Sequence, residues 1–402
     1  MKTKTIQSAD KKESVSMMEP MRLSEASKHR PYLNDLALEL ATQAAHFQGS
    51  LPKHIASSLA DLVRAMNCYY SNLIEGHDTH PVDIERALQE DYSNNTRQRH
   101  LQLEAKAHIA VQQWIDTGGL KNQATHVDSI CDIHRRFCEL LPDELLWIKD
   151  VDTNEQIQVM PGQLRKRNVQ VGRHIAISPA ALPRFLKRFE AAYDKLGKAE
   201  TILTTAAAHH RLLWLHPFLD GNGRVTRLMS QAMLLDTLKT EGIWSIARGL
   251  ARNEAEYKRH LAACDLPRRN DLDGRGVLSE EALAEFTRFF LETCIDQISF
   301  METLVAPDQL RHRILAWVHE ESRMSKLPPQ AATILERILY QGELPRDVVA
   351  PLFGVTPRHA RRYVEPLVEQ GVLVSENLRA PYRLAFPATL AHHWMPGLFP
   401  DK

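Results

Sequence analysis

The sequence lacks the features that would place the protein in a membrane or in an oxidising compartment. No apolar run approaches the roughly 20 residues that a membrane-spanning helix needs. Cysteine is scarce: there are five, and none forms a C-x-x-C pair. The first residues also lack the apolar segment of a secretory signal. An odd number of thiols in such a chain predicts reduced cysteines in a cytoplasmic protein.

The chain also lacks net charge. Its 50 Lys and Arg residues balance 50 Asp and Glu residues, so no overall attraction to a polyanion is expected, although local basic patches are not excluded. Hydrophobic residues make up 44% and aromatic residues 7% of the 402 residues. This composition is typical of an ordinary soluble protein with room for two or three domains.

The most informative segment is the dodecapeptide H-P-F-L-D-G-N-G-R-V-T-R, residues 216–227. The Ala- and Leu-rich run 201–215 predicts a helix that ends at His216, because the next residue is proline and disfavours the α region there. Residues 220–223 predict a turn, and residues 224–237 predict a second helix. A glycine-rich turn that leads into a helix presents backbone N–H groups and the positive end of the helix dipole to an anion.

The side chains of this segment suit phosphate chemistry. Arg224 and Arg227 lie three residues apart, so they share one helix face, and both can bind phosphate oxygens. Asp220 is a hard oxygen ligand suited to Mg²⁺, which proteins usually hold with one or two carboxylates plus substrate phosphates. His216 is the one group here whose ordinary pKa lies near neutrality, so it is the candidate general base. The alternative is a structural turn with a surface ion pair, which any two of these residues taken alone would favour.

The dodecapeptide resembles the Fic family motif H-x-F-x-[DE]-G-N-G-R-x-x-R and matches it at every fixed position. Most Fic proteins transfer AMP from ATP to a protein hydroxyl and release pyrophosphate. The resemblance therefore implies a protein adenylyltransferase that uses ATP and Mg²⁺. It implies that His216 deprotonates the target hydroxyl and that Asp220 carries Mg²⁺. The residues that it assigns to the anion hole and the outer phosphates are Gly221, Asn222, Gly223, Arg224 and Arg227.

A second segment, S-N-L-I-E-G at residues 71–76, resembles the family's inhibitory helix motif [ST]-x-x-x-E-[GN]. Ser71 and Glu75 lie four residues apart on one face of a predicted helix, and Gly76 suits the end of that helix. The resemblance implies that Glu75 pairs with Arg227, so that ATP binds in an unproductive pose. An ordinary solvated helix is the alternative, because S-x-x-x-E is a common pattern.

Residues 165–174 mix β-branched residues with a glycine and predict a short hairpin. By resemblance, this hairpin is the Fic flap, which lies over the active site and pairs with the target's backbone by strand addition. An ordinary hairpin with a basic edge is the alternative. The predicted flap residues are Gln170, Val171 and Gly172.

The remaining predicted nucleotide contacts lie elsewhere in the chain. By resemblance, Tyr257 lies beside the nucleotide base and Asp265 reaches the polar edge of the base, while a core position is the alternative for Tyr257. Val171 and Glu75 complete the predicted nucleotide site. A metal site at Cys131, His134 and Cys138, which share a helix face, is less favoured than core packing because the same stretch carries an apolar stripe.

The expected fold is mainly α: a Fic-type helical core with a β-hairpin flap, plus a small C-terminal winged helix-turn-helix domain. The expected boundaries are 1–32 for a disordered N-terminus, 33–124 for a helical region with the inhibitory helix, 125–305 for the catalytic core, 306–329 for a connector helix and 330–402 for the winged-helix unit and tail.

The C-terminal unit predicts three helices followed by a hairpin. Thr356 can cap the third helix, whose first residue is a proline. This order resembles a winged helix-turn-helix, in which the third helix would carry Arg358, His359, Arg361 and Arg362 toward a DNA groove. Many winged helices serve instead as interaction modules.

Three functions stay open at this point. The first is a self-inhibited protein adenylyltransferase that modifies a Ser, Thr or Tyr hydroxyl. The second is a DNA-binding regulator with a nucleotide-binding Fic domain, and the third is a bifunctional enzyme that adds and removes AMP. The sequence names no target protein. It also leaves open self-modification, a homodimer and DNA binding.

Overall fold

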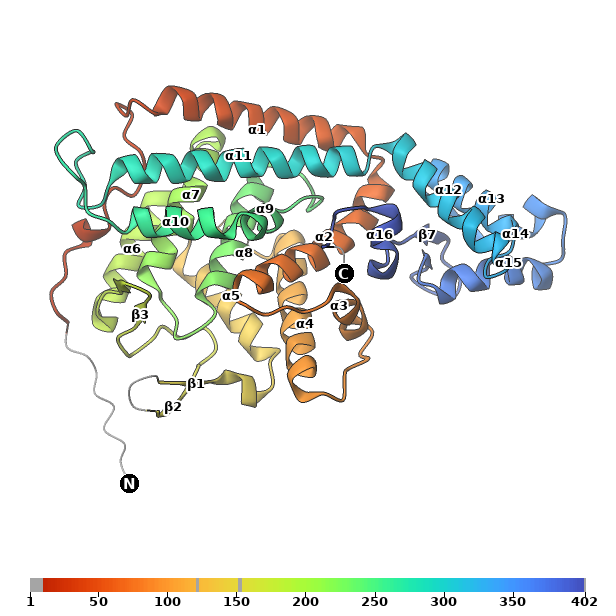
Figure 1. Ribbon diagram of the computed structural model, residues 1–402, viewed down its shortest axis with the longest axis horizontal. Coiled ribbons are helices and arrows are strands. Elements are labelled where there is room, and N and C mark those ends of the chain that lie inside the picture. The colour runs from red at the N-terminus through yellow and green to blue at the C-terminus, as the bar shows by residue number, and fades with distance from the viewer. Residues whose placement is uncertain (1–9, 121–122, 151–153, 401–402) are drawn as a thin grey trace.

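The structure, a computed structural model of the 402-residue chain, describes residues 10–120, 123–150 and 154–400. Helices make up most of it and the strands are short, so the chain is mainly α as expected (Figure 1). Among these residues, no helix is long and apolar enough to cross a membrane.

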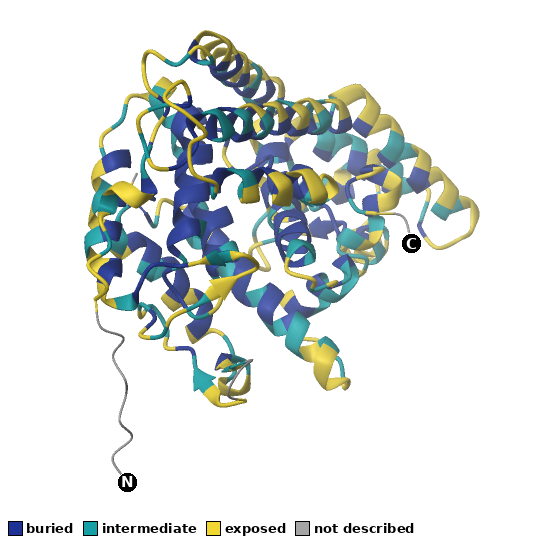
Figure 2. Cartoon of the chain, turned by 60° about the vertical axis from the view of Figure 1, so that its left-hand side comes forward, coloured by how far each residue is buried: buried dark blue, intermediate teal, exposed yellow. Residues whose placement is uncertain are grey.

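The centre of the molecule is a pair of adjacent helices, α7 (Lys198–Leu215) and α8 (Asn222–Leu238). Both bury most of their side chains, and the three alanines at 206–208 leave room for neighbouring helices to pack closely. A helix that is buried on all sides belongs to a protein core. The long helices α11 (Glu280–Leu304) and α1 (Arg30–Ser50) lie side by side along one edge of the molecule (Figure 1). Figure 2 shows the buried residues gathered inside these layers.

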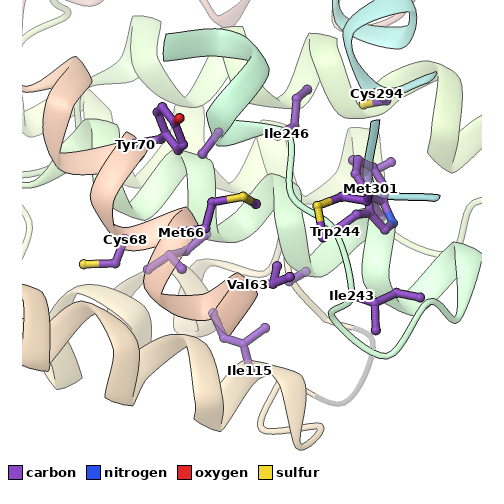
Figure 3. Close-up of a cluster of buried hydrophobic side chains, with 14 of the residues drawn as sticks. Val63, Met66, Cys68, Tyr70, Ile115, Ile243, Trp244, Ile246, Cys294 and Met301 are labelled. Atoms are coloured by element: carbon purple, nitrogen blue, oxygen red, sulfur yellow. The ribbon is translucent and has the colours of Figure 1, made fainter. Parts of the chain in front are cut away.

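The other helices of this body surround the central pair. Their bounds are Lys53–Ile74 for α2, Pro81–Leu88 for α3, Thr96–Asp116 for α4, Val127–Glu139 for α5, Leu182–Tyr193 for α6, Ala247–Arg252 for α9 and Glu254–Cys264 for α10. Helix α2 packs on α4 and α9. Its residues Val63, Met66 and Tyr70 belong to a buried cluster with Ile115 of α4 and Trp244 (Figure 3). This packing fixes the position of the end of α2, where the predicted inhibitory motif lies.

The N-terminal segment corrects one expectation. We expected residues 1–32 to be disordered; residues 1–9 lie outside the described part, but residues 10–32 pack on the helical body. The side chains of Met18 and Met21 are buried, and the Tyr193 hydroxyl donates a hydrogen bond of 2.5 Å to Met21 O. A few apolar anchors in an otherwise polar segment are enough to hold it, because each buried side chain of this size contributes about 1.5–3 kcal/mol.

Two hairpins lie near the body. The predicted hairpin is present: β3 (Gln170–Val171) and β4 (His174–Ile175) pair antiparallel. A second antiparallel pair, β1 (Trp147–Lys149) with β2 (Gln156–Gln158), was not predicted. Short 3-10 helices lie at Val15–Met18, Asp143–Leu146, Pro179–Ala181 and Ala388–Leu390.

The C-terminal unit follows α12, which begins at Pro307. The bounds are Pro307–Arg323 for α12, Gln330–Gln341 for α13, Glu343–Leu344 for β5, Arg346–Phe353 for α14, Pro357–Glu369 for α15, Leu373–Val374 for β6 and Tyr382–Leu384 for β7. The strands form one antiparallel sheet in the order β5-β7-β6. Thr356 caps α15, because its side chain accepts a hydrogen bond from His359 N. The helices and the hairpin therefore follow the predicted order, while the winged-helix assignment stays a prediction.

After β7, the chain leaves this unit and returns to α2. Helix α16 (Ala391–Trp394) packs on α12, and beyond it the Tyr70 hydroxyl of α2 donates a hydrogen bond of 2.9 Å to Leu398 O. Leu398 is fully buried there. The expected unit 330–402 is therefore too long, since its last residues contribute to the helical body.

Candidate functional site

Residues 216–227 form the loop and the first turns that connect α7 to α8. Helix α7 ends before His216, which is left-handed (φ 47°), so the helix end predicted from Pro217 is confirmed. Gly221 is also left-handed (φ 78°), a conformation that glycine adopts without penalty. Helix α8 begins at Asn222, earlier than expected, so the motif itself supplies the first N–H groups of the helix.

A buried phenylalanine anchors the loop. Asn222 Oδ1 accepts a hydrogen bond from Phe218 N and Asn222 Nδ2 donates one to Phe218 O, both at 2.9 Å. The Phe218 ring stacks on His134, with ring centroids 3.9 Å apart. The Asn222 side chain therefore holds the loop, and its predicted place in the anion hole stays a prediction. The stacking of His134 favours the packing interpretation of that residue.

The general-base candidate lies half-buried at the end of α7. Burial, and then the charges of Arg165 and His174, lower the pKa of His216 to about 4. An imidazole with such a pKa is neutral at pH 7, so it can accept a proton. The arrangement suits a base that removes a proton from a hydroxyl group.

The first arginine of the predicted phosphate clamp is held between two carboxylates. Arg224 Nη1 lies 3.3 Å from Glu104 Oε2 of α4, and Arg224 Nη2 donates a hydrogen bond of 3.3 Å to Asp220 Oδ2. Its guanidinium lies over the Phe137 ring, 4.6 Å from the centroid. The buried Nε of Arg224 has no hydrogen-bond partner among the described residues. This nitrogen is a donor left over for a phosphate oxygen.

The second arginine is bound by the end of α2. Arg227 Nε donates a hydrogen bond of 2.8 Å to Ser71 Oγ, and Arg227 Nη2 donates to Ser71 O at 3.1 Å and to Glu75 Oε1 at 2.5 Å. The Arg227 side chain is only 3% exposed. Gly76, left-handed with φ 82°, ends the turn after Glu75. We refer to Ser71, Glu75 and Arg227 together as the arginine clasp.

The clasp also covers the start of α8. A methyl group added to Gly223 would meet Glu75 Oε1 at 2.1 Å, so the carboxylate lies against the backbone of the predicted anion hole. Burial alone would raise the pKa of Glu75, but the charge and hydrogen bond of Arg227 outweigh it, and the pKa lies below its ordinary value. Glu75 is therefore ionised at neutral pH and brings a negative charge to the place where an anion would bind.

The two residues predicted to contact the base, Tyr257 and Asp265, each lie beside a histidine of α7. Tyr257 is 2% exposed, and its hydroxyl lies 2.6 Å from His209 Nε2. This enclosure agrees with the core alternative, and the predicted contact of Tyr257 with the base stays a prediction. Asp265 lies 3.0 Å from His210 Nε2, and its predicted contact with the base stays a prediction.

The hairpin has an exposed apolar surface. Val171 and Ile175 are 47% and 67% exposed, and Gly172 is left-handed (φ 60°) in the turn between the strands. Within the described residues, β3 pairs with β4 alone, so its outer edge offers free backbone groups. Such an edge can pair with an extended peptide.

Three residues at the site, Glu104, His77 and Arg165, were not identified from the sequence. Glu104 binds Arg224, and its Oε2 lies 2.8 Å from His77 Nδ1. Arg165, inside the predicted hairpin segment, donates hydrogen bonds to backbone carbonyls around His216. Spacing gives no signal for Glu104, which lies more than 100 residues before its partner. The sequence pattern places Arg165 on a basic hairpin edge, although it is buried.

Comparisons with known proteins agree on one family. Residues 124–234 match the model of the Fic/DOC family. A segment of 76 residues, 18% of this chain, is 36% identical to the protein adenylyltransferase Fic of Drosophila erecta and likewise to that of Drosophila melanogaster. The matched segment spans only 15% of the length of each of these curated relatives. The fold is similar to that of a Fic family protein from Desulfovibrio desulfuricans, with a TM-score of 0.54 and 15% identity over 90% of this chain and 98% of the other.

Proposed function

We propose that this chain, which is a Fic family protein, is a self-inhibited protein adenylyltransferase that transfers AMP from ATP to a protein hydroxyl and releases pyrophosphate. The relatives that it resembles carry the name protein adenylyltransferase, and the match to the Fic/DOC family model, residues 124–234, includes the whole 216–227 motif. The supporting observation in this chain is the arginine clasp, which joins a serine and a glutamate of α2 to an arginine of the motif.

The clasp supports inhibition on electrostatic grounds. While Arg227 is bound to Glu75, its guanidinium is not available to a phosphate, and Glu75 adds a negative charge beside the anion hole. A polyphosphate would have to compete with a carboxylate that is already desolvated and hydrogen-bonded. Interactions of this kind, between a charged donor and its partner, are worth about 1.5–3 kcal/mol each. ATP therefore binds in an unproductive pose until the clasp opens.

In the transfer step, His216 accepts the proton of the target hydroxyl, and the hydroxyl oxygen bonds to the α-phosphorus of ATP. The bond between the α-phosphorus and the bridging oxygen breaks, and pyrophosphate leaves with that oxygen. Arg224 and the released Arg227 bind the outer phosphates during this step. Since His216 is neutral at pH 7, no prior deprotonation is needed.

A metal ion fits the site. The Asp220 side chain is 53% exposed just before α8, and its ion pair with Arg224 is long at 3.3 Å. A single accessible carboxylate beside a phosphate site is the donor set with which proteins hold Mg²⁺ on a nucleotide. Asp220 would hold the ion, which when bound neutralises phosphate charge.

The hairpin β3–β4 is proposed to hold the target. Strand addition at β3 would use backbone hydrogen bonds, with Val171 in contact with the nucleotide side and Gln170 and Gly172 at the pairing edge. This mode needs little side-chain specificity, which fits a site that has to accept an extended segment of another protein.

The test uses the full chain with Mg²⁺ and ATP labelled in the α-phosphate. The Glu75→Gly variant should attach label covalently to itself or to added protein, and the Glu75→Gly, His216→Ala double variant should not. Label that is absent from Glu75→Gly under all acceptor conditions would overturn the proposal. The same incubation reveals self-modification. Incubating the labelled product without ATP shows whether AMP is also removed.

A second candidate function rests on α15. Arg358, His359, Arg361 and Arg362 are all exposed on this helix, and none of the three arginines forms an ion pair with another described residue. Four basic side chains without carboxylate partners favour binding to a polyanion such as DNA. In a binding titration with duplex DNA, the affinity should fall steeply with salt. An affinity that does not change with salt would demote the unit to a protein-interaction module.

A further inference from the structure

Arg165 is a buried cation that binds only backbone carbonyls. The residue is only 3% exposed. Nε donates to His216 O at 2.7 Å, Nη1 to Arg167 O at 2.8 Å, and Nη2 to Ile177 O at 2.7 Å and to Leu215 O at 3.4 Å. One guanidinium thus uses all three of its nitrogens on main-chain oxygens.

These carbonyls belong to three separate pieces of chain. Arg167 precedes β3 and Ile177 follows β4, so they mark the two legs of the hairpin. Leu215 and His216 form the end of α7 and the start of the motif loop. The two legs and the loop therefore meet on one side chain.

Neighbouring contacts join the same segments. Arg165 N donates a hydrogen bond of 2.9 Å to Pro217 O, and His174 Nε2 of β4 lies 2.7 Å from Trp214 O. At the far side, Ser178 donates from its backbone and its hydroxyl to the Glu13 carboxylate, at 2.8 and 2.5 Å. The hairpin legs are thus fixed on both sides, with Arg165 at the side of His216.

A buried guanidinium without a carboxylate partner is costly to keep. No carboxylate of the described residues forms an ion pair with Arg165, and burial lowers its pKa to about 10 although the charge of Glu13 acts in the opposite direction. Burying a charge is unfavourable unless other groups compensate for it, and four carbonyls do so here only in part. An uncharged side chain would fill the space at lower cost, so the position of this charge points to a role in the site.

We propose that Arg165 is a positioning residue, which holds the hairpin and the His216 loop as one unit and so sets the place of a bound peptide segment relative to the imidazole. This inference rests on the proposed function, because the hairpin matters for transfer only if it holds the target. It extends that function to the geometry between target and base. A displacement of about 1 Å in such geometry can cost a hundredfold in rate.

The charge of Arg165 gives the test a second readout. The charged and titratable groups that act on His216 are Arg165, His174 and the Asp220 carboxylate, and only Asp220 raises its pKa. Removing the charge of Arg165 should raise the pKa of His216. The acid limb of the pH–rate profile should then move to higher pH.

The experiment compares Arg165→Gln and Arg165→Lys, both made in the Glu75→Gly full chain, which is released from the clasp. Arg313→Gln is the matched control, because Arg313 also donates to backbone carbonyls, those of Trp394 and Leu304, but lies on α12. Initial rates of labelled-AMP incorporation are measured against pH. Hydrogen exchange is followed at peptides covering 165–177 and 214–218.

Arg165→Gln should lose transfer by roughly tenfold to hundredfold, with ATP affinity unchanged and the acid limb at higher pH. Arg165→Lys keeps the charge but not the several N–H donors of the guanidinium. Its rate should therefore fall, while the acid limb of its pH–rate profile should stay where it lies in the Glu75→Gly chain. In both variants the two peptides should exchange faster together, and in Arg313→Gln neither should. If only one of the two Arg165 variants folds, the hydrogen exchange and the transfer rate of that variant are sufficient to test the proposal.

Two outcomes separate the inference from the function on which it rests. Full activity with an unchanged acid limb in Arg165→Gln, or exchange that accelerates at neither peptide, overturns the inference and leaves AMP transfer intact. If the Glu75→Gly chain itself transfers no AMP, the proposed function fails. The exchange measurement then still decides whether Arg165 joins the hairpin to the loop.

Discussion

Replacing Ser71 by alanine tests the clasp without removing a charge. Ser71 Oγ accepts a hydrogen bond of 2.8 Å from Arg227 Nε, and the arginine is almost fully buried. The alanine variant leaves a charged donor without its partner, which costs about 1.5–3 kcal/mol. This cost falls only on the closed state, in which α2 binds Arg227.

The expected consequence follows from that cost. Since each 1.4 kcal/mol is a factor of ten in an equilibrium constant, the ratio of open to closed clasp should rise by roughly ten- to a hundredfold. Transfer should rise with this ratio until the clasp is mostly open. In the absence of ATP, the free energy of unfolding should fall by no more than about 3 kcal/mol. The loss is limited because the protein can shift to the open state, which does not carry this cost.

The assay pairs urea unfolding with the initial rate of labelled-AMP incorporation. Ser50→Ala is the control, because Ser50 also lies in the last turn of a helix, and its hydroxyl donates to a backbone oxygen, Phe47 O, away from the site. It should change the rate little. A Ser71→Ala protein that loses stability while its transfer rate stays at the wild-type level would refute the idea that the clasp restrains the enzyme.

Other predictions follow from the same site. His216→Ala should retain ATP binding and lose transfer about a hundredfold or more, as measured by label incorporation and nucleotide titration; a wild-type rate would remove it from the mechanism. Asp220→Ala or EDTA should abolish transfer, and undiminished activity in EDTA would contradict the metal assignment. Because the pKa of Glu75 is lowered on folding, its pairing stabilises the protein above the ordinary pKa of a carboxyl group and is lost as the pH falls through the folded value. The stability difference between wild type and Glu75→Gln in urea should therefore shrink in acid, and a constant difference would count against the pairing. Arg361→Ala and Arg362→Ala should each reduce the slope of log affinity for DNA against log salt by about 0.9; unchanged slopes would exclude phosphate contacts there.

Much of the site followed from local patterns. A proline after His216 was enough to end α7 there, and the glycines of the motif predicted the turn before α8. The pairing of Glu75 with Arg227 joins segments 152 residues apart, and it was predicted only through the resemblance of two short motifs to one family. Neither motif alone contains information about their distance in space.

The parts that were missed depend on tertiary packing. Arg165 has the same sequence signal as its half-buried neighbour Arg167, and only the fold shows that Arg165 is fully enclosed. For Tyr257, on a helix of mixed composition, the sequence left a core position and a contact with the base open, and only the fold shows its enclosure. The segment 10–32 is polar on average, so composition concealed the few apolar residues, such as Met18, that anchor it.

The central claim is that Glu75 restrains Arg227 and that Arg227, once free, drives AMP transfer. The measurement is the initial rate of labelled-AMP incorporation at equal protein concentration for wild type, Glu75→Gly and the double variant Glu75→Gly with Arg227→Ala. Transfer should rise in Glu75→Gly, and the double variant should lose the gain because the released arginine delivers it. Equal rates for wild type and Glu75→Gly, or a double variant as active as the single one, would contradict the account.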